Sequence, residues 1–257
     1  MSNNQIAILG QFKNELESDF VKGVLETSLK EGAGAFMASL VETFSSESSL
    51  QECKPSLVIA EALKAASLKL PVTKGLGQAF IIAYKGKPSF QIGYKGFIQL
   101  AIRSGLYETI NADVVYEGEL TRQDKLKGTF DINGAKKSDV VIGYFAHIDL
   151  KNGFSKTLFM TKDKVTAHAK KYSKTFNSDY SPWKSDFDAM ALKTVLKNIL
   201  SHYGSLSVDM QAAFNDDIED EINANANTEN VTFTEAVIVD PPKKEEGKKS
   251  STKKPAF

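Results

Sequence analysis

The stretch GQAFIIAYKGKPSFQIGYKGFIQLAIRSG, residues 77–105, decides the fold of this chain. Its runs at 78–84 and 89–93 are rich in β-forming residues and flank Lys85-Gly86-Lys87-Pro88, which together predict a β-hairpin. Residues 94–104 then keep the three- and four-residue spacing of apolar side chains that is typical of a helix. The stretch therefore predicts a hairpin followed directly by a helix.

Upstream of the hairpin the chain predicts only helices. Apolar residues recur at helical spacing throughout 12–50, where Gly32 and Gly34 would separate two helices. A further helix is expected over about 56–70, with Pro55 near its start.

Downstream of residue 105 the chain returns to short strands before its last helices. Strands are expected at 110–117, 127–132, 139–150 and 155–160. The last two are joined around Asn152-Gly153, the strongest hairpin signal in the chain. Helices are expected over 162–172 and 182–203, the second with Ser181 as N-cap and Pro182 in its first turn. Helices combined with antiparallel hairpins indicate an α+β protein.

Composition divides the chain into three segments of opposite charge. Residues 1–53 carry 3 Lys+Arg and 8 Asp+Glu, a net charge of −5. Residues 54–200 carry 23 and 13, a net charge of +10, whereas 201–257 carry 6 and 11, again −5. We expect an acidic helical segment at 1–53, a basic core at 54–212 and a flexible tail at 213–257. A basic segment of this kind favours a polyanionic partner.

Cysteine content and hydropathy indicate a reduced, cytoplasmic protein. Cys53 is the single cysteine, so an intramolecular disulfide or a cysteine-built zinc site is excluded. No stretch approaches the roughly 18 apolar residues of a membrane span. The N-terminal residues also lack the pattern of a secretory signal.

The sequence contains no motif that indicates a class of enzyme. A P-loop is absent, and the three histidines at 147, 168 and 202 are isolated rather than paired as metal ligands. Asp186 and Asp188 lie two residues apart near the start of a helix, which the helix dipole explains better than a metal-dependent nuclease does. We expect no catalytic residue, no metal site and no nucleotide, and leave a role for Mg²⁺ open.

The basic residues of the middle segment lie at turns and at the ends of elements, with aromatic residues between them. Cations for phosphates combined with flat side chains for bases are what sequence-independent binding of a single strand requires. Strand alternation puts Phe80, Ile82 and Tyr84 on one face of the predicted hairpin. Lys193 and Lys197, four residues apart, project from one stripe of the last helix.

Six blocks of sequence resemble the RecT family of phage single-strand annealing recombinases, in order and in spacing, over roughly residues 55–205. The first three are GQAF at 77–80, QIGYKG at 91–96 and LAIRSG at 100–105. The later three are AKKYS at 169–173, SPW at 181–183 and MALKTVLK at 190–197.

The resemblance implies both a fold and a function. Proteins of this family, which is related to the phage lambda beta protein, coat single-stranded DNA and pair it with a complementary strand without ATP. They assemble as rings or filaments and act with a 5′-to-3′ exonuclease in the bacterial host cell. The implied fold is a small, bent antiparallel sheet backed by helices, with a positively charged groove. A host single-strand binding protein is a second candidate partner, and the tail is a candidate docking segment.

Two positions depart from the family's pattern. Asn198 stands where many relatives have a second consecutive basic residue, and Ile102 stands where arginine is common. The expected DNA-binding residues are Lys74, Gln91, Lys95, Arg103, Arg122, Lys127, Lys170, Lys171, Lys174, Trp183, Lys184, Lys193 and Lys197. A passive single-strand binding protein without annealing activity remains the alternative. The acidic segment at 1–53 is a candidate oligomer contact, docking on the basic body of a neighbour.

Overall fold

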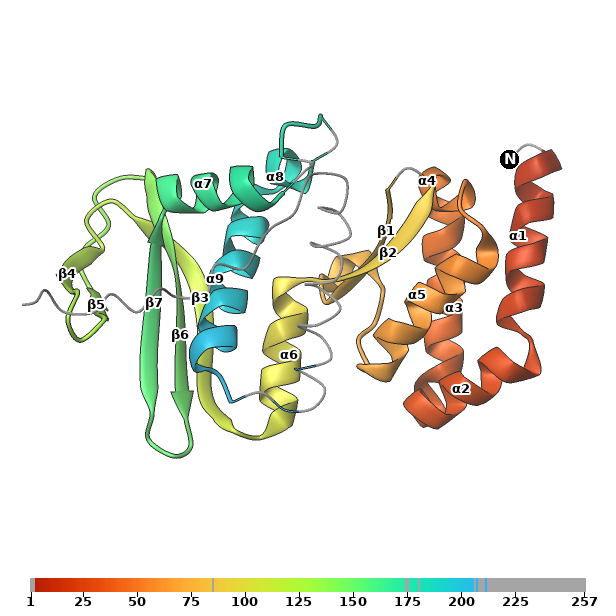
Figure 1. The fold of residues 1–257 in the computed structure, drawn as a ribbon, viewed down its shortest axis with the longest axis horizontal. Helices are drawn as coiled ribbons and strands as arrows, with labels where there is room; N and C mark the ends of the chain where they lie inside the picture. Colours follow the sequence, from red (N-terminus) through yellow and green to blue (C-terminus); the bar gives the residue numbers. More distant parts are fainter. Residues whose placement is uncertain are drawn as a thin grey trace, which may run out of the picture.

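The computed structural model describes residues 3–84, 86–173, 176–179, 181–205, 207 and 211. Lys174 and the predicted tail at 213–257 lie outside the described residues. The described chain is elongated, with a helical half and a half built on a β-sheet, joined by a hairpin and one helix (Figure 1).

The helical half is formed by the first five helices and confirms the predicted helical N-terminus. These are α1 (Asn3–Leu16), α2 (Asp19–Leu29), α3 (Ala33–Ser46), α4 (Ser48–Gln51) and α5 (Pro55–Ser67), with short 3₁₀ turns η1 (Lys30–Gly32) and η2 (Lys74–Leu76). The rings of Phe12 and Phe44 stack with centroids 3.9 Å apart, which ties α1 to α3. The break near Gly32 is as predicted, whereas the break between α1 and α2 at Ser18 was not expected.

The connection between the halves is the predicted hairpin and helix. Strands β1 (Ala79–Tyr84) and β2 (Lys87–Ile92) pair antiparallel, and α6 (Tyr94–Ser104) follows at once. Gly105 adopts a left-handed conformation, with a φ of 69°, and caps α6 as glycine does at many helix ends. One face of the hairpin packs on α5 and buries Ile81, Phe90 and Ile92.

The second half is a three-stranded antiparallel sheet in the order β3–β6–β7. Its strands are β3 (Tyr107–Tyr116), β6 (Val141–Leu150) and β7 (Ser155–Thr161). Helix α9 (Phe187–Tyr203) packs on one face, where it covers the fully buried side chains of Tyr144, Ala146 and Ile148 (Figure 1). Helix α6 packs against both α9 and β3, so the hairpin is anchored in both halves.

The predicted last helix is divided into two. A short helix α8 (Pro182–Ser185) ends at Asp186, whose φ of −151° is not helical. Asp186 then caps α9 by accepting a hydrogen bond from the amide of Ala189 at 3.1 Å. Ser181 caps α8 as predicted, with the Trp183 amide 3.3 Å from its hydroxyl. The acidic residue at 186 therefore has a structural role, as the sequence favoured.

A second small hairpin projects from the far edge of the sheet. It consists of β4 (Leu120–Asp124) and β5 (Thr129–Ile132), which lie beside β7 and at the opposite end of the molecule from α1 (Figure 1). Strand β4 was not predicted, because LTRQD carries neither apolar alternation nor a run of β-branched residues. We call residues 117–139 the arm.

The α+β class is confirmed, and the described residues form three separate antiparallel sheets. One hydrophobic core runs through both halves and includes Leu40 and Val58 in the first and Phe97 and Val195 in the second. The N-terminal helices are therefore part of the core. Among the helices of the described residues, none combines the length and apolar character needed to span a bilayer.

Candidate nucleic-acid interface

The outer face of the β1–β2 hairpin carries aromatic and amide side chains. Phe80, Ile82 and Tyr84 share this face, as the alternation predicted, and each is half-buried. Gln91 stands opposite Phe80 on the neighbouring strand and donates a hydrogen bond from Nε2 to the Tyr84 hydroxyl at 3.1 Å. Flat side chains with a fixed amide are suited to contact with bases or sugars.

The glycines of the hairpin–helix junction are required by the protein's own backbone. A Cβ at Gly93 would lie 2.2 Å from the carbonyl oxygen of Gly77, and one at Gly96 would lie 2.2 Å from that of Gln78. Backbone segments 77–78 and 93–96 therefore touch directly. This contact places the first turn of α6 beside η2, where two of the expected cations lie.

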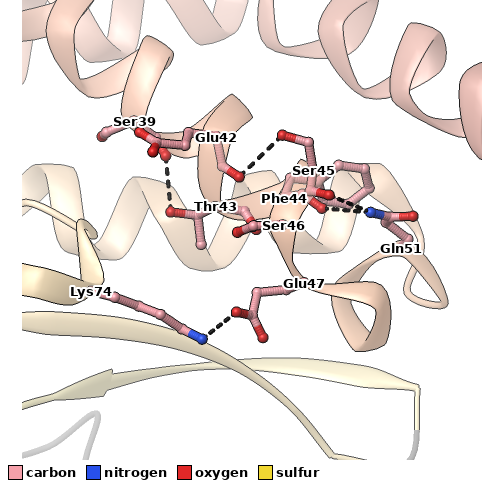
Figure 2. Close-up of polar contacts among 9 residues, drawn as sticks. All are labelled: Ser39, Glu42, Thr43, Phe44, Ser45, Ser46, Glu47, Gln51 and Lys74. Atoms are coloured by element: carbon pink, nitrogen blue, oxygen red, sulfur yellow. Dashed lines mark hydrogen bonds and ion pairs between the residues drawn. The ribbon is translucent and has the colours of Figure 1, made fainter. Parts of the chain in front are cut away.

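Lys74 and Lys95 are those two cations. Lys95 is exposed on the first turn of α6, where its stem passes Gly77 and its Nζ lies 5.9 Å from the centre of the Tyr94 ring. Lys74 forms an ion pair with Glu47, at the start of α4 (Figure 2). Glu47 lies in the turn between α3 and α4, and Gln51 closes this turn by donating hydrogen bonds to the backbone carbonyls of Phe44 and Ser45 (Figure 2). Lys74 is therefore partly neutralised, whereas Lys95 is the more available cation.

Arg103 makes contacts within the protein. Its guanidinium donates to the backbone carbonyl of Leu68 at 2.6 Å and to that of Lys69 at 3.4 Å, beyond the end of α5. Two of its donors are thus used in joining α6 to the helical half.

A second group of cations lies on the consecutive helices α7, α8 and α9. Helix α7 (Lys162–Tyr172) is capped by Thr161 and ends in Lys170 and Lys171, both exposed. The Nζ of Lys171 lies 5.0 Å from the centre of the Tyr172 ring. Figure 1 shows that α7 crosses one end of the sheet and that its C-terminal end lies close to α8.

Lys193 and Lys197 extend this group along α9. Both are half-buried, and they lie on the stripe next to the buried residues Val195 and Ile199. Lys184, on α8, forms an ion pair with Asp179 at 2.8 Å. The helices α7–α9 therefore carry seven lysines against two aspartates, and five of the lysines are among the expected DNA contacts.

The burial of Trp183 bears on one expectation. Its side chain is only 6% exposed and packs against Phe176 and Phe187, with ring centroids 6.1 and 5.4 Å away. A ring enclosed in this way packs as a core residue, so its packing favours a structural role and its contact with DNA stays a prediction. The sequence could not distinguish a core residue from a DNA contact, since an aromatic residue at the start of a helix is compatible with both roles.

Arg122 and Lys127 lie apart from both groups, on the arm at the end of the molecule (Figure 1). The guanidinium of Arg122 lies 4.0 Å from the carboxylate of Asp124. The structure thus divides most of the expected residues into three groups. The hairpin group is Lys74, Gln91 and Lys95, the α7–α9 group is Lys170, Lys171, Lys184, Lys193 and Lys197, and the arm group is Arg122 and Lys127. Lys174 lies outside the described residues.

Asp188 and His147 form hydrogen bonds within the protein that stabilise its fold. Burial raises the pKa of the Tyr144 phenol, and the hydrogen bond of 2.6 Å that its hydroxyl donates to Asp188 raises it further. His147 bridges Thr157 and Asp149 on the sheet, at 2.8 and 3.0 Å. Within the described part of the chain, no three His, Cys, Asp or Glu side chains come together as a metal site would require.

Sequence reasoning left Phe80 and Tyr84 out of the expected site, although it placed them on one face. The missing information was which face of the hairpin α5 covers, and alternation alone does not decide this. The basic residues were easier to find, because their types and spacing mark them directly.

Comparison with known proteins identifies the family. The model of the RecT family matches residues 34–229. The chain is 45% identical to the uncharacterized protein YqaK of Bacillus subtilis (strain 168), over 93% of this chain and 83% of that protein. It is 25% identical to protein RecT of Escherichia coli (strain K12), over 74% of this chain and 73% of that protein. Because the family model covers most of the chain, including the hairpin and all the helices that carry the expected cations, this protein belongs to the RecT family.

Proposed function

We propose that this protein binds single-stranded DNA along its basic middle segment and anneals complementary strands without ATP. Membership of the RecT family supports single-strand annealing recombination as its general role, and proteins of this family are annealing proteins rather than catalytic enzymes. The observation that carries the finer proposal is the set of lysines on α7–α9, with Lys170 and Lys171 exposed at the end of one helix and Lys193 and Lys197 four residues apart on another.

The proposed mechanism is electrostatic and requires no covalent step. Lysines neutralise phosphates, which relieves repulsion between two strands held near each other. Contacts to the backbone leave the Watson–Crick edges free, so that base pairing itself selects the partner strand. The outer face of the hairpin, with Tyr84 and Gln91, would hold bases or sugars at the border of the basic region.

We assign the DNA contacts to the hairpin and α7–α9 groups. Lys95, Lys170, Lys171, Lys193 and Lys197 are the main phosphate contacts. Lys74 and Lys184 are further candidate phosphate contacts, and each also forms an ion pair with a carboxylate of the protein. If one protomer neutralises five phosphates, its affinity for a single strand falls with a log–log salt slope of about −3.5.

The test is annealing of two labelled complementary oligonucleotides without ATP, over a series of salt concentrations. We compare the parent protein with Lys193→Ala/Lys197→Ala and with the control Lys22→Ala/Lys54→Ala, which removes two exposed lysines from the helical half. We expect faster pairing with the parent and the control, and a loss of both binding and pairing in the first variant. Tight binding without faster pairing would favour the passive binding protein, and a salt slope near zero would refute the electrostatic mechanism.

We also propose that the protein assembles head to tail. Residues 1–53 carry a net charge of −5 and 54–200 a net charge of +10, so the acidic end of one protomer is attracted to the basic body of the next. Such a contact uses two different surfaces and grows into a filament or a ring. Deleting residues 1–50 would be a poor test, because Phe12, Leu25 and Leu40 belong to the core. Charge reversals on exposed acids are the better test.

A partner-binding role for the tail is the last part of the proposal. A short apolar run, VTFTEAVIV at 231–239, lies within the otherwise polar segment 213–257. We propose that it docks on an exonuclease or on a host single-strand binding protein. Truncation after residue 212 should abolish capture of such a partner by the purified protein and leave annealing intact, and unchanged capture would refute the idea.

A further inference from the structure

The tip of the arm presents one leucine to solvent between two lysines. Leu126 is 95% exposed, the highest exposure among the large hydrophobic side chains of the described residues. Lys125 and Lys127 flank it, and Arg122 lies three residues before this trio. A large apolar side chain at the end of a projecting hairpin gains free energy when a partner covers it.

The tip is held in one shape. Oδ1 of Asp124 accepts hydrogen bonds from the amides of Leu126 and Lys127, each at 3.0 Å, which fixes the turn. The Nζ of Lys156, on β7, lies 3.4 Å from the carbonyl oxygen of Lys127. Leu126 is thus displayed at the end of a defined turn.

The base of the arm is also fixed on the sheet. The rings of Phe130 and Phe159 pack with centroids 5.7 Å apart, and Thr121 donates to the side chain of Asn133 at 2.7 Å. The arm is therefore anchored on β7 by the Phe130–Phe159 contact, and its own two sides are joined by the Thr121–Asn133 hydrogen bond.

A shallow apolar groove lies at the other end of the molecule, between α1 and α3. It has a volume of about 330 Å³ and is lined by Leu16, Met37, Ala38 and Val41, with Lys13 and Glu17 also on its lining. The lining itself holds one base and one acid, whereas the segment 1–53 that forms the groove carries a net charge of −5. The groove therefore combines an apolar floor with a position in the acidic segment of the chain.

We propose that the arm of one protomer docks on the α1–α3 groove of a second copy of this chain, with Leu126 on the apolar floor and Lys125 and Lys127 facing the acids around it. The arm and α1 lie at opposite ends of the long axis, so the contact is between molecules (Figure 1). The inference rests on the proposed head-to-tail assembly and names the two surfaces that make it.

Charge favours a protein partner over DNA for this arm. Residues 117–139 contain five acidic and five basic side chains, so the arm as a whole has no net positive charge to hold a phosphate backbone. Only the tip is basic, and it matches a local acidic surface better than an extended polyanion.

Cross-linking of variants that each carry one added cysteine tests the contact directly. Leu126→Cys and Met37→Cys are prepared separately, and the native Cys53 is only 3% exposed, so the parent protein gives the background. Mixing the two variants without DNA under mild oxidation should give a disulfide-linked dimer that neither gives alone. The control pairs Leu126→Cys with Ala60→Cys, which is exposed on α5. Equal cross-linking at positions 37 and 60 would overturn the inference.

Sedimentation of Leu126→Asp gives a second, independent measurement. We expect at least a tenfold weaker self-association than in the parent protein, whereas Val140→Asp, at a site that is 60% exposed near the base of the arm, should assemble normally. A variant that assembles normally but binds DNA more weakly would show the tip to be a DNA contact and overturn the inference. A parent protein that anneals DNA but stays monomeric would refute the assembly while leaving the annealing proposal intact.

Discussion

The guanidinium of Arg103 joins α6 to the residue that ends α5, donating to the backbone carbonyl of Leu68 at 2.6 Å. A second donor reaches the carbonyl of Lys69, whose φ of 53° is left-handed, at 3.4 Å. Carbonyls at the end of a helix have no intrahelical partner, so an arginine there satisfies them and complements the helix dipole. Arg103 therefore connects the two halves of the molecule.

We expect Arg103→Lys to destabilise the protein although the charge is kept. Lysine lacks the planar fork that reaches two carbonyls at once, so the free energy of unfolding should fall by about 1 kcal/mol. Urea unfolding followed by circular dichroism measures this change. Unchanged stability combined with weaker binding of single-stranded DNA would instead assign Arg103 to the phosphate contacts.

Gly96→Ala should destabilise the hairpin–helix junction. The added Cβ would lie 2.2 Å from the carbonyl oxygen of Gln78, and the backbone must move apart to admit it, at a cost of roughly 1–3 kcal/mol. Thermal unfolding measures the loss. Gly75→Ala is the matched control, because a Cβ there meets no atom within 4 Å. Equal melting temperatures for the two variants would contradict the close approach.

Much of the fold could be predicted from local patterns. The hairpin at 78–93, the helix after it and the turn at Asn152-Gly153 each carry strong turn or periodicity signals, and all are found. Strand β4 and the break at Asp186 were missed, because LTRQD lacks the apolar alternation of a strand and the helical spacing of apolar residues continues from Trp183 to Phe187. Strand β4 is held by pairing with β5, and α9 restarts where Asp186 can cap it.

The types of residue in the candidate site could be predicted from the sequence, but the exposure of their side chains could not. Lysines on α7 and α9 are marked by their spacing, whereas the burial of Trp183 and the carbonyl contacts of Arg103 are set by tertiary packing. The exposed face of the hairpin depends equally on where α5 lies. Sequence thus finds candidates, and packing decides which of them face solvent.

Removing the two lysines at the end of α7 should reduce the salt dependence of DNA binding. If Lys170 and Lys171 each neutralise one phosphate, Lys170→Ala/Lys171→Ala lowers the magnitude of the log–log salt slope by about 1.4. Fluorescence anisotropy with a labelled oligonucleotide over a salt series gives the slope. The control Lys22→Ala/Lys54→Ala should keep the parent slope, and an equal drop in both variants would mean that only the overall charge matters.

The buried phenol of Tyr107 should make the free energy of unfolding decrease at alkaline pH. Burial raises the pKa of this phenol to about 12, and the hydroxyl donates a hydrogen bond to the Ser205 carbonyl at 3.0 Å. In the unfolded chain the phenol ionises near pH 10. The folded protein therefore keeps a proton that the unfolded chain has lost, and the free energy of unfolding decreases as pH rises from 10 to 12.

Comparison with Tyr107→Phe isolates this contribution. The variant lacks the hydroxyl, so its stability should decrease less over the same pH interval, with a difference of at most about 3 kcal/mol. Urea unfolding at several alkaline pH values measures the two curves. Parallel curves for the parent and the variant would show that the phenol is not protected by the fold.

Trp183 is the only tryptophan in the chain, so its fluorescence reports on a single site. Because the side chain is 6% exposed and packed against Phe176 and Phe187, its emission should be blue-shifted and poorly quenched by acrylamide. Adding single-stranded DNA should leave the emission nearly unchanged, since the enclosed ring offers no face to a base. Strong quenching by DNA under conditions where binding is complete would mean that α8 opens to release the ring. Trp183→Phe, which preserves an aromatic ring in the cluster, should then bind DNA as the parent does if the role of Trp183 is packing alone, and more weakly if it stacks on a base.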